Sequence, residues 1–329
     1  MKSSTALPLT LGALALLLLV ASLFAGDAQL SGSEVVQGLF GDGSAAEIVI
    51  RQIRLPRAIL AALVGGALGL AGAALQGFLR NPLAEPGVIG VSPAASLGAV
   101  LALYFGWAAA FPLALPLAAM TGALASTLIL VAIASRDASV LALILAGAAI
   151  SSLAMALTAL AMNLAPNPYA LSEIVFWLMG TLKDRSFDDV AIAAPFIAAG
   201  AALLLLSGRG LNALSLGEDV AHSLGVSVRR LGLIVVLGVT LAVGAATASA
   251  GAIGFVGLVV PHLLRPWAKY EPRRLLIPSA LGGAALVQAA DIAVRVLPVR
   301  PELMLGVLTA IIGAPFFLHL IFTTRRVLR

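Results

Sequence analysis

A chain of 329 residues that is 61% hydrophobic and 11% charged differs from soluble domains, in which about a quarter of the residues are charged. Its net charge is +5, and the basic residues lie in short loops between apolar runs. This distribution indicates the orientation of the chain in a membrane and argues against a nucleic-acid partner. The lack of cysteine excludes disulfides, thiolate metal sites and cysteine nucleophiles.

Apolar runs of about twenty residues recur along the chain, and in a bilayer such runs form helices, which satisfy their own backbone hydrogen bonds. We expect an all-α polytopic membrane protein in which residues 1–329 form a single transmembrane domain. Ten spans are predicted near residues 7–25, 58–77, 88–105, 113–134, 139–162, 190–206, 231–249, 253–267, 276–294 and 304–322.

Two apolar segments have other interpretations. The first run follows a basic residue and precedes small residues, so a cleaved signal peptide is the alternative to a retained helix. The stretch 170–180 is too short to cross a bilayer, and we expect a partly inserted helix there. Small residues such as Gly65, Gly66 and Gly69 favour close packing between helices.

The loops indicate the orientation of the chain. If both termini are cytoplasmic, the inner side carries 13 of the 20 basic residues and only 5 of the 15 acidic residues. The positive-inside rule favours this arrangement. We therefore expect both termini in the cytoplasm.

Three arginines, Arg51, Arg54 and Arg57, precede the second span on the expected outer side. Their spacing places them near one another on a helix. An exposed cluster suits bidentate pairing with carboxylates of a docking protein, and contact with lipid phosphates is the alternative. In the ninth span, Asp291 precedes Arg295 by four residues, which predicts an ion pair near the outer end.

The turn 80–87 contains two prolines, Asn81 and Gly87, and it predicts a rigid cytoplasmic hairpin between two spans. Such a hairpin suits a gate at a pore mouth, although its composition alone favours a plain helix-breaking turn.

The longest inner loop, residues 208–230, predicts two short helices lying flat beneath the membrane domain. Ser215 is placed to cap the second helix, whose first turn contains Glu218 and Asp219, and Gly225 is placed to end it. A partner protein would grip its exposed apolar residues, and an amphipathic helix resting on lipid is the alternative. These residues are Leu216, Val220, Ala221 and Leu224.

The sequence also bears on the kind of transport. Its histidines are few and widely separated, and no cluster of His, Asp and Glu lies in the spans, so a chelated ligand suits the chain better than a naked metal ion. A secondary transporter needs ionisable groups near mid-membrane, whereas Asp291 lies near the end of a span. An intramembrane enzyme is disfavoured because the chain has neither a His-Glu-x-x-His motif nor paired intramembrane acids.

Several long motifs, in order, resemble the FecCD-type permeases of ABC importers for iron siderophores, haem and cobalamin. Ser92-Pro93 departs from the Ser-Ser or Ser-Asn-Gly expected in that family, which puts the shape of this turn in question. The motifs that carry the resemblance are Arg54-Leu-Pro-Arg57, Leu75 to Gly87, Gly90-Val-Ser-Pro93, Phe176 to Gly180, Ser215 to Val226, Gly254 to His262 and Gly306 to Pro315.

This resemblance implies a homodimer of ten-helix subunits in the bacterial inner membrane, with two ATPase subunits below and a periplasmic substrate-binding protein above. The pathway would lie at the dimer interface. An iron complex, either a ferric siderophore or haem, is the expected substrate, and cobalamin is the alternative. No glycine precedes any of the three lysines, so a phosphate-binding Walker A loop is absent and the ATPase must be another chain. We expect no enzymatic activity and no cofactor in this subunit.

The resemblance also assigns roles to particular residues. Arg54, Arg57 and Arg295 would meet acidic residues of the binding protein. Asn81 and Leu83 would lie near the cytoplasmic gate. The residues expected to couple the permease to the ATPase are Ser215, Leu216, Gly217, Glu218, Ala221, Leu224 and Gly225.

Overall fold

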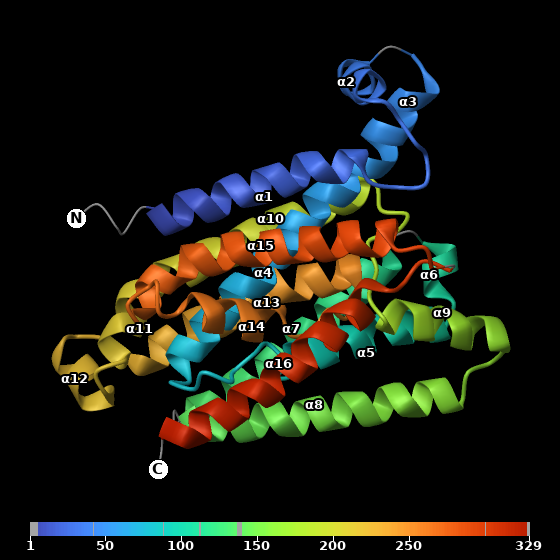
Figure 1. Cartoon of the computed structure of the whole chain (residues 1–329). Coiled ribbons are helices and arrows are strands. Elements are labelled where there is room, and N and C mark those ends of the chain that lie inside the picture. Colours follow the sequence, from blue (N-terminus) through green and yellow to red (C-terminus); the bar gives the residue numbers. More distant parts are fainter. Residues whose placement is uncertain are drawn as a thin grey trace.

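The computed structural model describes residues 6–41, 43–87, 89–111, 113–136, 140–299 and 301–327. Every regular element in these segments is a helix, which confirms the all-α prediction. The long helices lie side by side in one elongated bundle (Figure 1). They are α1 (Ala6–Phe24), α4 (Leu55–Phe78), α5 (Val91–Tyr104), α7 (Ala114–Arg136), α8 (Val140–Asn163), α10 (Phe187–Leu206), α13 (Val228–Ala250), α15 (Pro272–Val296) and α16 (Leu305–Val327).

Short helices connect the long ones. One of them is π-helical, η1 (Ile48–Arg54), and it runs directly into α4. The others are α2 (Gly32–Phe40), α3 (Ala45–Glu47), α6 (Trp107–Ala110), α9 (Pro168–Leu178), α11 (Gly208–Leu214), α12 (Glu218–Ser223) and α14 (Val256–Leu264).

Among the described residues, seven helical stretches are long and apolar enough to cross a membrane. They include α1, α7, α8, α10, α13, α15 and the continuous stretch Ala45–Phe78. The predicted spans 88–105, 253–267 and 304–322 coincide with shorter apolar helices in α5, α14 and α16. Because a helix rises about 1.5 Å per residue, the 14 residues of α5 cover less than the roughly 30 Å of a hydrocarbon core. The predicted short helix at 170–180 is α9.

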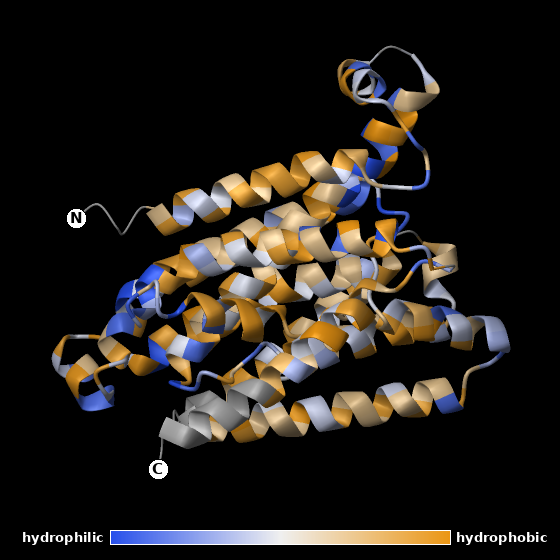
Figure 2. Cartoon of the chain, in the orientation of Figure 1, coloured by the Kyte–Doolittle hydropathy of each residue, from blue (hydrophilic) through white to orange (hydrophobic). Residues whose placement is uncertain are grey.

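The bundle has two distinct ends. We call them the α2 end, where α2 and α3 protrude near α6 and α9, and the α12 end, which carries α11 and α12 (Figure 1). Helix α1 begins and α16 finishes at the α12 end, so the first and the last helix have these ends on the same side of the bundle. Hydrophilic residues gather at both ends, and apolar residues dominate the helices between them (Figure 2).

Glycines bring the backbones of α4 and α15 into contact. A Cβ atom on Gly65 would overlap the carbonyl oxygen of Gly283, and one on Gly69 would overlap the carbonyl oxygen of Ser279. Helix α4 also contacts α1, α10, α13 and α14, so it is the central helix of the bundle. The small residues of α4 therefore allow the close approach that the sequence predicted.

Two neighbouring glycines of α4 test this contact. Gly65→Ala forces the α4 and α15 backbones apart, and overpacking of this kind costs about 1–3 kcal/mol, so the detergent-solubilised protein should unfold at a lower temperature. Gly66→Ala is the matched control, because its Cβ would lie 3.5 Å from the carbonyl oxygen of Ala280, an ordinary contact. Equal unfolding temperatures for the two variants would contradict the packing described here.

Candidate functional site

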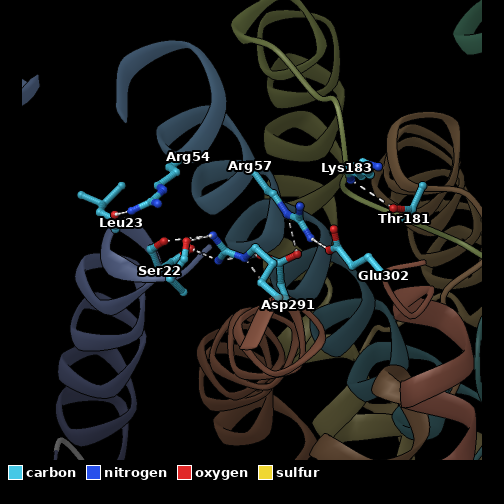
Figure 3. A network of polar contacts seen from close by, with 10 residues as sticks. Ser22, Leu23, Arg54, Arg57, Thr181, Lys183, Asp291 and Glu302 are labelled. Carbon is cyan, nitrogen blue, oxygen red and sulfur yellow. Dashed lines mark hydrogen bonds and ion pairs between the residues drawn. The ribbon is translucent and has the colours of Figure 1, made fainter. Parts of the chain in front are cut away.

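A buried ionic network closes the α2 end of the bundle (Figure 3). At its centre is Asp291 of α15, which is fully buried. Nε of Arg57 donates to Oδ1 of Asp291 at 2.8 Å, and Nη2 of Arg295 lies 2.8 Å from Oδ2. Arg57 also forms an ion pair with Glu302. The predicted pair between Asp291 and Arg295 is confirmed, and Arg57, far away in the sequence, shares its carboxylate.

Two arginines fasten the end of α1 to this network. Arg295 donates through Nη1 to the carbonyl oxygens of Ser22 and Ala25, at 3.0 and 3.1 Å. Arg54 donates through Nη1 to the carbonyl oxygen of Leu23 at 2.7 Å and through Nη2 to that of Ala28. The last carbonyls of a helix have no donor within the helix, so the guanidinium groups satisfy those of Ser22 and Leu23 and also bind the segment that follows α1.

The expectation of an exposed arginine cluster is wrong for two of its three members. Arg54 and Arg57 are 4% and 7% exposed, whereas Arg51 is exposed and pairs with Glu47 at 3.0 Å. The reason is local geometry, since η1 is a π-helix whose hydrogen bonds join residues i and i+5. Residues three apart in η1 therefore do not share a face, so Arg51 is turned to solvent while Arg54 is buried. Arg57, in the first turn of α4, is buried as well.

A cavity of about 900 Å³ adjoins the network. Its walls carry groups of both signs, including Lys183 and Asp184 from the loop that precedes α10, and Arg54, Arg57 and Arg295 all line it. The cavity therefore gives polar groups of another molecule a route to arginines that are otherwise buried.

At the α12 end, the segment between α4 and α5 forms a tight hairpin around Asn81. Its side-chain Oδ1 accepts a hydrogen bond from the amide of Leu83 at 2.9 Å, and its backbone amide donates to the carbonyl of Gln76 at 3.2 Å. Asparagine favours turns because its side chain can bond the backbone two residues on. The segment forms a tight turn, as predicted, and this turn holds Asn81 and Leu83 together.

The hairpin packs against the start of α14. A Cβ on Gly257 would lie 3.1 Å from Cδ of Pro86, and burial raises the pKa of the Glu85 carboxyl group above the usual range. Ala84 and Ile89 are buried, and Oγ of Ser151 in α8 donates to the carbonyl of Gly87 at 2.8 Å. The later part of the hairpin is therefore held by contacts with α8 and α14, while Arg80 and Asn81 at its start are exposed.

Gln76 is a residue that the sequence reasoning missed. Its Nε2 lies 3.3 Å from the carbonyl oxygens of both Gly257 and Leu258, and its Oε1 accepts from Arg265. Proline has no amide hydrogen, so Pro261 inside α14 leaves the carbonyl of Gly257 without its helical donor. That proline is the signal in the sequence that a polar partner was needed.

The 208–230 loop contains the two predicted short helices, α11 and α12. Gly225 follows the end of α12 with a φ of +78°, as expected for a residue that ends a helix. The predicted cap by Ser215 is wrong, because Ser215 still lies on the last turn of α11 and its hydroxyl donates to the carbonyl of Asn212 at 2.7 Å. Gly217, with a φ of +111°, precedes α12 instead.

The apolar surface of this loop is smaller than predicted. Leu216, Val220 and Leu224 are 65%, 43% and 62% exposed and recur every fourth residue, so they form one stripe. Ala221 was expected on this surface but is fully buried in the core of the bundle. We call Leu216, Val220 and Leu224 the leucine stripe.

Removing the central carboxylate of the network should destabilise the protein. Asp291→Asn leaves the buried Arg57 and Arg295 without the charge they share, a loss of about 3–5 kcal/mol for a broken buried pair. Glu47→Gln is the control, because it breaks the exposed pair with Arg51, worth about 1 kcal/mol or less. Thermal unfolding in detergent measures both variants, and an Asp291→Asn protein as stable as Glu47→Gln would refute this account of the network.

The model of the FecCD transport family matches residues 14–323. The cobalamin import system permease protein BtuC of Halobacterium salinarum is 40% identical over 285 residues, which cover 86% of this chain and 75% of the relative. The hemin transport system permease protein HmuU of Yersinia pestis is 39% identical over 283 residues, or 83% of each chain.

A solved structure agrees with these relatives. It is described as an inward-facing conformation of a candidate metal-chelate type ABC transporter. The two folds agree with a TM-score of 0.86 at 32% sequence identity, over 96% of this chain and 98% of the other. Because the family model covers nearly the whole chain and the relatives are permeases of similar length, the chain belongs to the FecCD transport family, the permease subunits of ABC importers.

Proposed function

We propose that this chain is the permease of a binding-protein-dependent ABC importer that moves a metal chelate into the cytoplasm. The observation that carries the proposal is the family match over residues 14–323, which includes the hairpin, the 208–230 loop and the ionic network. The ATP is hydrolysed by a separate subunit, and two copies of that subunit serve a homodimer of this chain in the bacterial inner membrane.

In this proposal the α12 end faces the cytoplasm and the 208–230 loop docks on the ATPase. The leucine stripe supports this role, because three large apolar side chains on one face suit burial against a partner protein. The coupling residues are Leu216, Glu218 and Leu224, with Ser215, Gly217, Ala221 and Gly225 shaping the two helices. Asn81 and Leu83, in the adjacent hairpin, form part of the cytoplasmic gate.

The α2 end then faces the periplasm and receives the binding protein. Arg54, Arg57 and Arg295 are buried, but all three line the cavity of about 900 Å³. Carboxylates of the binding protein would enter this cavity and exchange with Asp291 and Glu302 as partners of the arginines. Bidentate arginine–carboxylate pairing favours such an exchange.

The substrate pathway runs between the two copies of the chain. A cavity of about 450 Å³ lies where α9 meets α16 and is lined by residues such as Met179, Ala252 and Gly306. Its lining residues are small or apolar, which suits a bulky chelate recognised by shape. Each carboxylate oxygen of Asp291 faces an arginine, so neither is free to hold a coupling ion, and this argues against a secondary transporter.

An iron complex, either a ferric siderophore or haem, is the substrate we favour. Cobalamin is the second candidate, because the relative from Halobacterium salinarum is named for cobalamin import. The relative from Yersinia pestis is named for hemin transport, so both ligand classes belong in one experiment.

Uptake into proteoliposomes tests the function directly. The vesicles hold this permease with its ATPase and binding protein, and a ferric hydroxamate siderophore, hemin and cyanocobalamin are offered with ATP inside or absent. We expect one ligand to accumulate only when ATP is present, because in the proposed importer ATP hydrolysis by the separate ATPase subunit drives transport. Uptake that ignores ATP and follows an imposed ion gradient would favour a secondary transporter.

A charge on the leucine stripe should separate the permease from its ATPase. Leu224→Asp places a carboxylate in the proposed apolar contact, and we expect affinity for the ATPase to fall at least about tenfold, as for a hot-spot residue. His222→Asp adds the same charge to α12 two residues away, outside the stripe, and should lower affinity less. Co-purification and titration of the ATPase measure both, and equal losses would argue against the stripe as the contact.

A further inference from the structure

An ion pair joins the proposed coupling loop to the proposed gate. Nη2 of Arg80, at the start of the hairpin, lies 3.0 Å from Oε1 of Glu218, the first residue of α12. The two residues are 138 positions apart in the sequence. At the α12 end, the other ion pair formed by described residues, Arg274 with Glu271, joins residues three apart at the start of α15. Among the described residues at the α12 end, the Arg80–Glu218 pair is therefore the ion pair that joins segments distant in the sequence.

The backbone of Arg80 indicates that its side chain matters. Arg80 has a φ of +47°, in the left-handed region that most side chains avoid. Glycine adopts this conformation without steric cost. An arginine at this position is therefore better explained by what its guanidinium contacts than by the demands of the turn, and the contact that the structure shows is Glu218.

From Arg80 the contacts continue into α14. The amide of Asn81 donates to the carbonyl of Gln76, whose side chain reaches the carbonyls of Gly257 and Leu258. Further along the hairpin, a Cβ on Gly257 would lie 3.1 Å from Cδ of Pro86, so the hairpin packs closely on α14. The hairpin therefore touches α14 directly and is tied to it through Gln76 of α4, so it is placed to move with it.

Helix α14 in turn packs on α16, which borders the cavity of about 450 Å³. A Cβ on Gly313 would overlap the side chain of Phe255, so these two residues are in close contact. The rings of His262 and Phe316 meet edge to face with centroids 6.0 Å apart. A displacement of α12 would thus reach the cavity through the hairpin, α14 and α16, all by direct contacts.

We propose that Arg80 is a positioning residue, and that its ion pair with Glu218 couples movement of the ATPase-docking loop to the hairpin and to α14 and α16. The inference rests on the proposed function. Both side chains are about half exposed, at 44% and 46%, so the pair adds little to the stability of the fold. Its loss should leave a folded permease in which ATP hydrolysis and transport are less tightly linked.

The experiment measures ATP hydrolysed per ligand transported. Proteoliposomes hold the permease with its ATPase and binding protein, and the probes are a ferric hydroxamate siderophore, hemin and cyanocobalamin. The variants are Arg80→Glu, Glu218→Arg, the double exchange and Arg80→Lys. Arg274→Gln is the matched control, because it breaks an ion pair of similar exposure at the same end of the bundle.

Each single charge reversal should raise the ratio of ATP to ligand about two- to fivefold, the range expected for an exposed pair. The double exchange and Arg80→Lys should restore the ratio towards the wild-type value, and Arg274→Gln should leave it unchanged. Unfolding temperatures should stay close to that of the wild type in all variants. Recovery in the double exchange identifies the pair, because a purely structural defect at either residue would not be rescued.

Three results would each overturn the inference while leaving the proposed function intact. The first is a wild-type ratio in both single reversals. The second is a double exchange as defective as the singles, and the third is an equal defect in Arg274→Gln. A wild-type complex that accumulates none of the probes with ATP would instead reject the proposed function, and the role of Arg80 with it.

Discussion

The contact between the backbones of α4 and α15 sets the positions of the other helices. Lipid offers no hydrophobic drive for helices to associate, so they depend on close packing, and glycines such as Gly65 and Gly283 allow the closest. Burial differs widely between the helices. In α13 and in the stretch Ala45–Phe78 that contains α4, 78% of the apolar window is buried, whereas in α1 the figure is 11%. The bundle therefore has an enclosed centre and outer helices whose apolar surface is largely exposed.

The two ends of the bundle differ in how they hold charge. At the α2 end, Arg57, Arg295 and Asp291 are enclosed by protein, and a charge pair of this kind is costly to break because each ion would be left buried. At the α12 end, the pair between Arg80 and Glu218 is open to solvent and its strength depends on salt. One end is thus suited to holding helices in place, and the other to changing its contacts during a transport cycle.

Local patterns in the sequence were reliable guides to local structure. Hydropathy located the long helices, Gly225 marked the end of α12, and the four-residue spacing of Asp291 and Arg295 predicted their ion pair. Structural features that depend on segments distant in the sequence could not be predicted from these local patterns. Arg57 shares Asp291 across 234 positions of sequence, and nothing near Arg57 indicates this partner. The π-helical turn that separates Arg54 from Arg51 also leaves no periodic signal, because several backbone registers fit the same apolar pattern.

The arginine-capped end of α1 bears on how the protein is made. Helix α1 is synthesised before both of the groups that bond its terminal carbonyls, because Arg54 lies in η1 and Arg295 lies in α15. Until α15 emerges from the ribosome, the carbonyl groups that Arg295 will bond must accept hydrogen bonds from water or from lipid headgroups instead. The free carbonyl groups therefore keep this end of the nascent helix at the membrane surface, and its final hydrogen bonds form late in assembly.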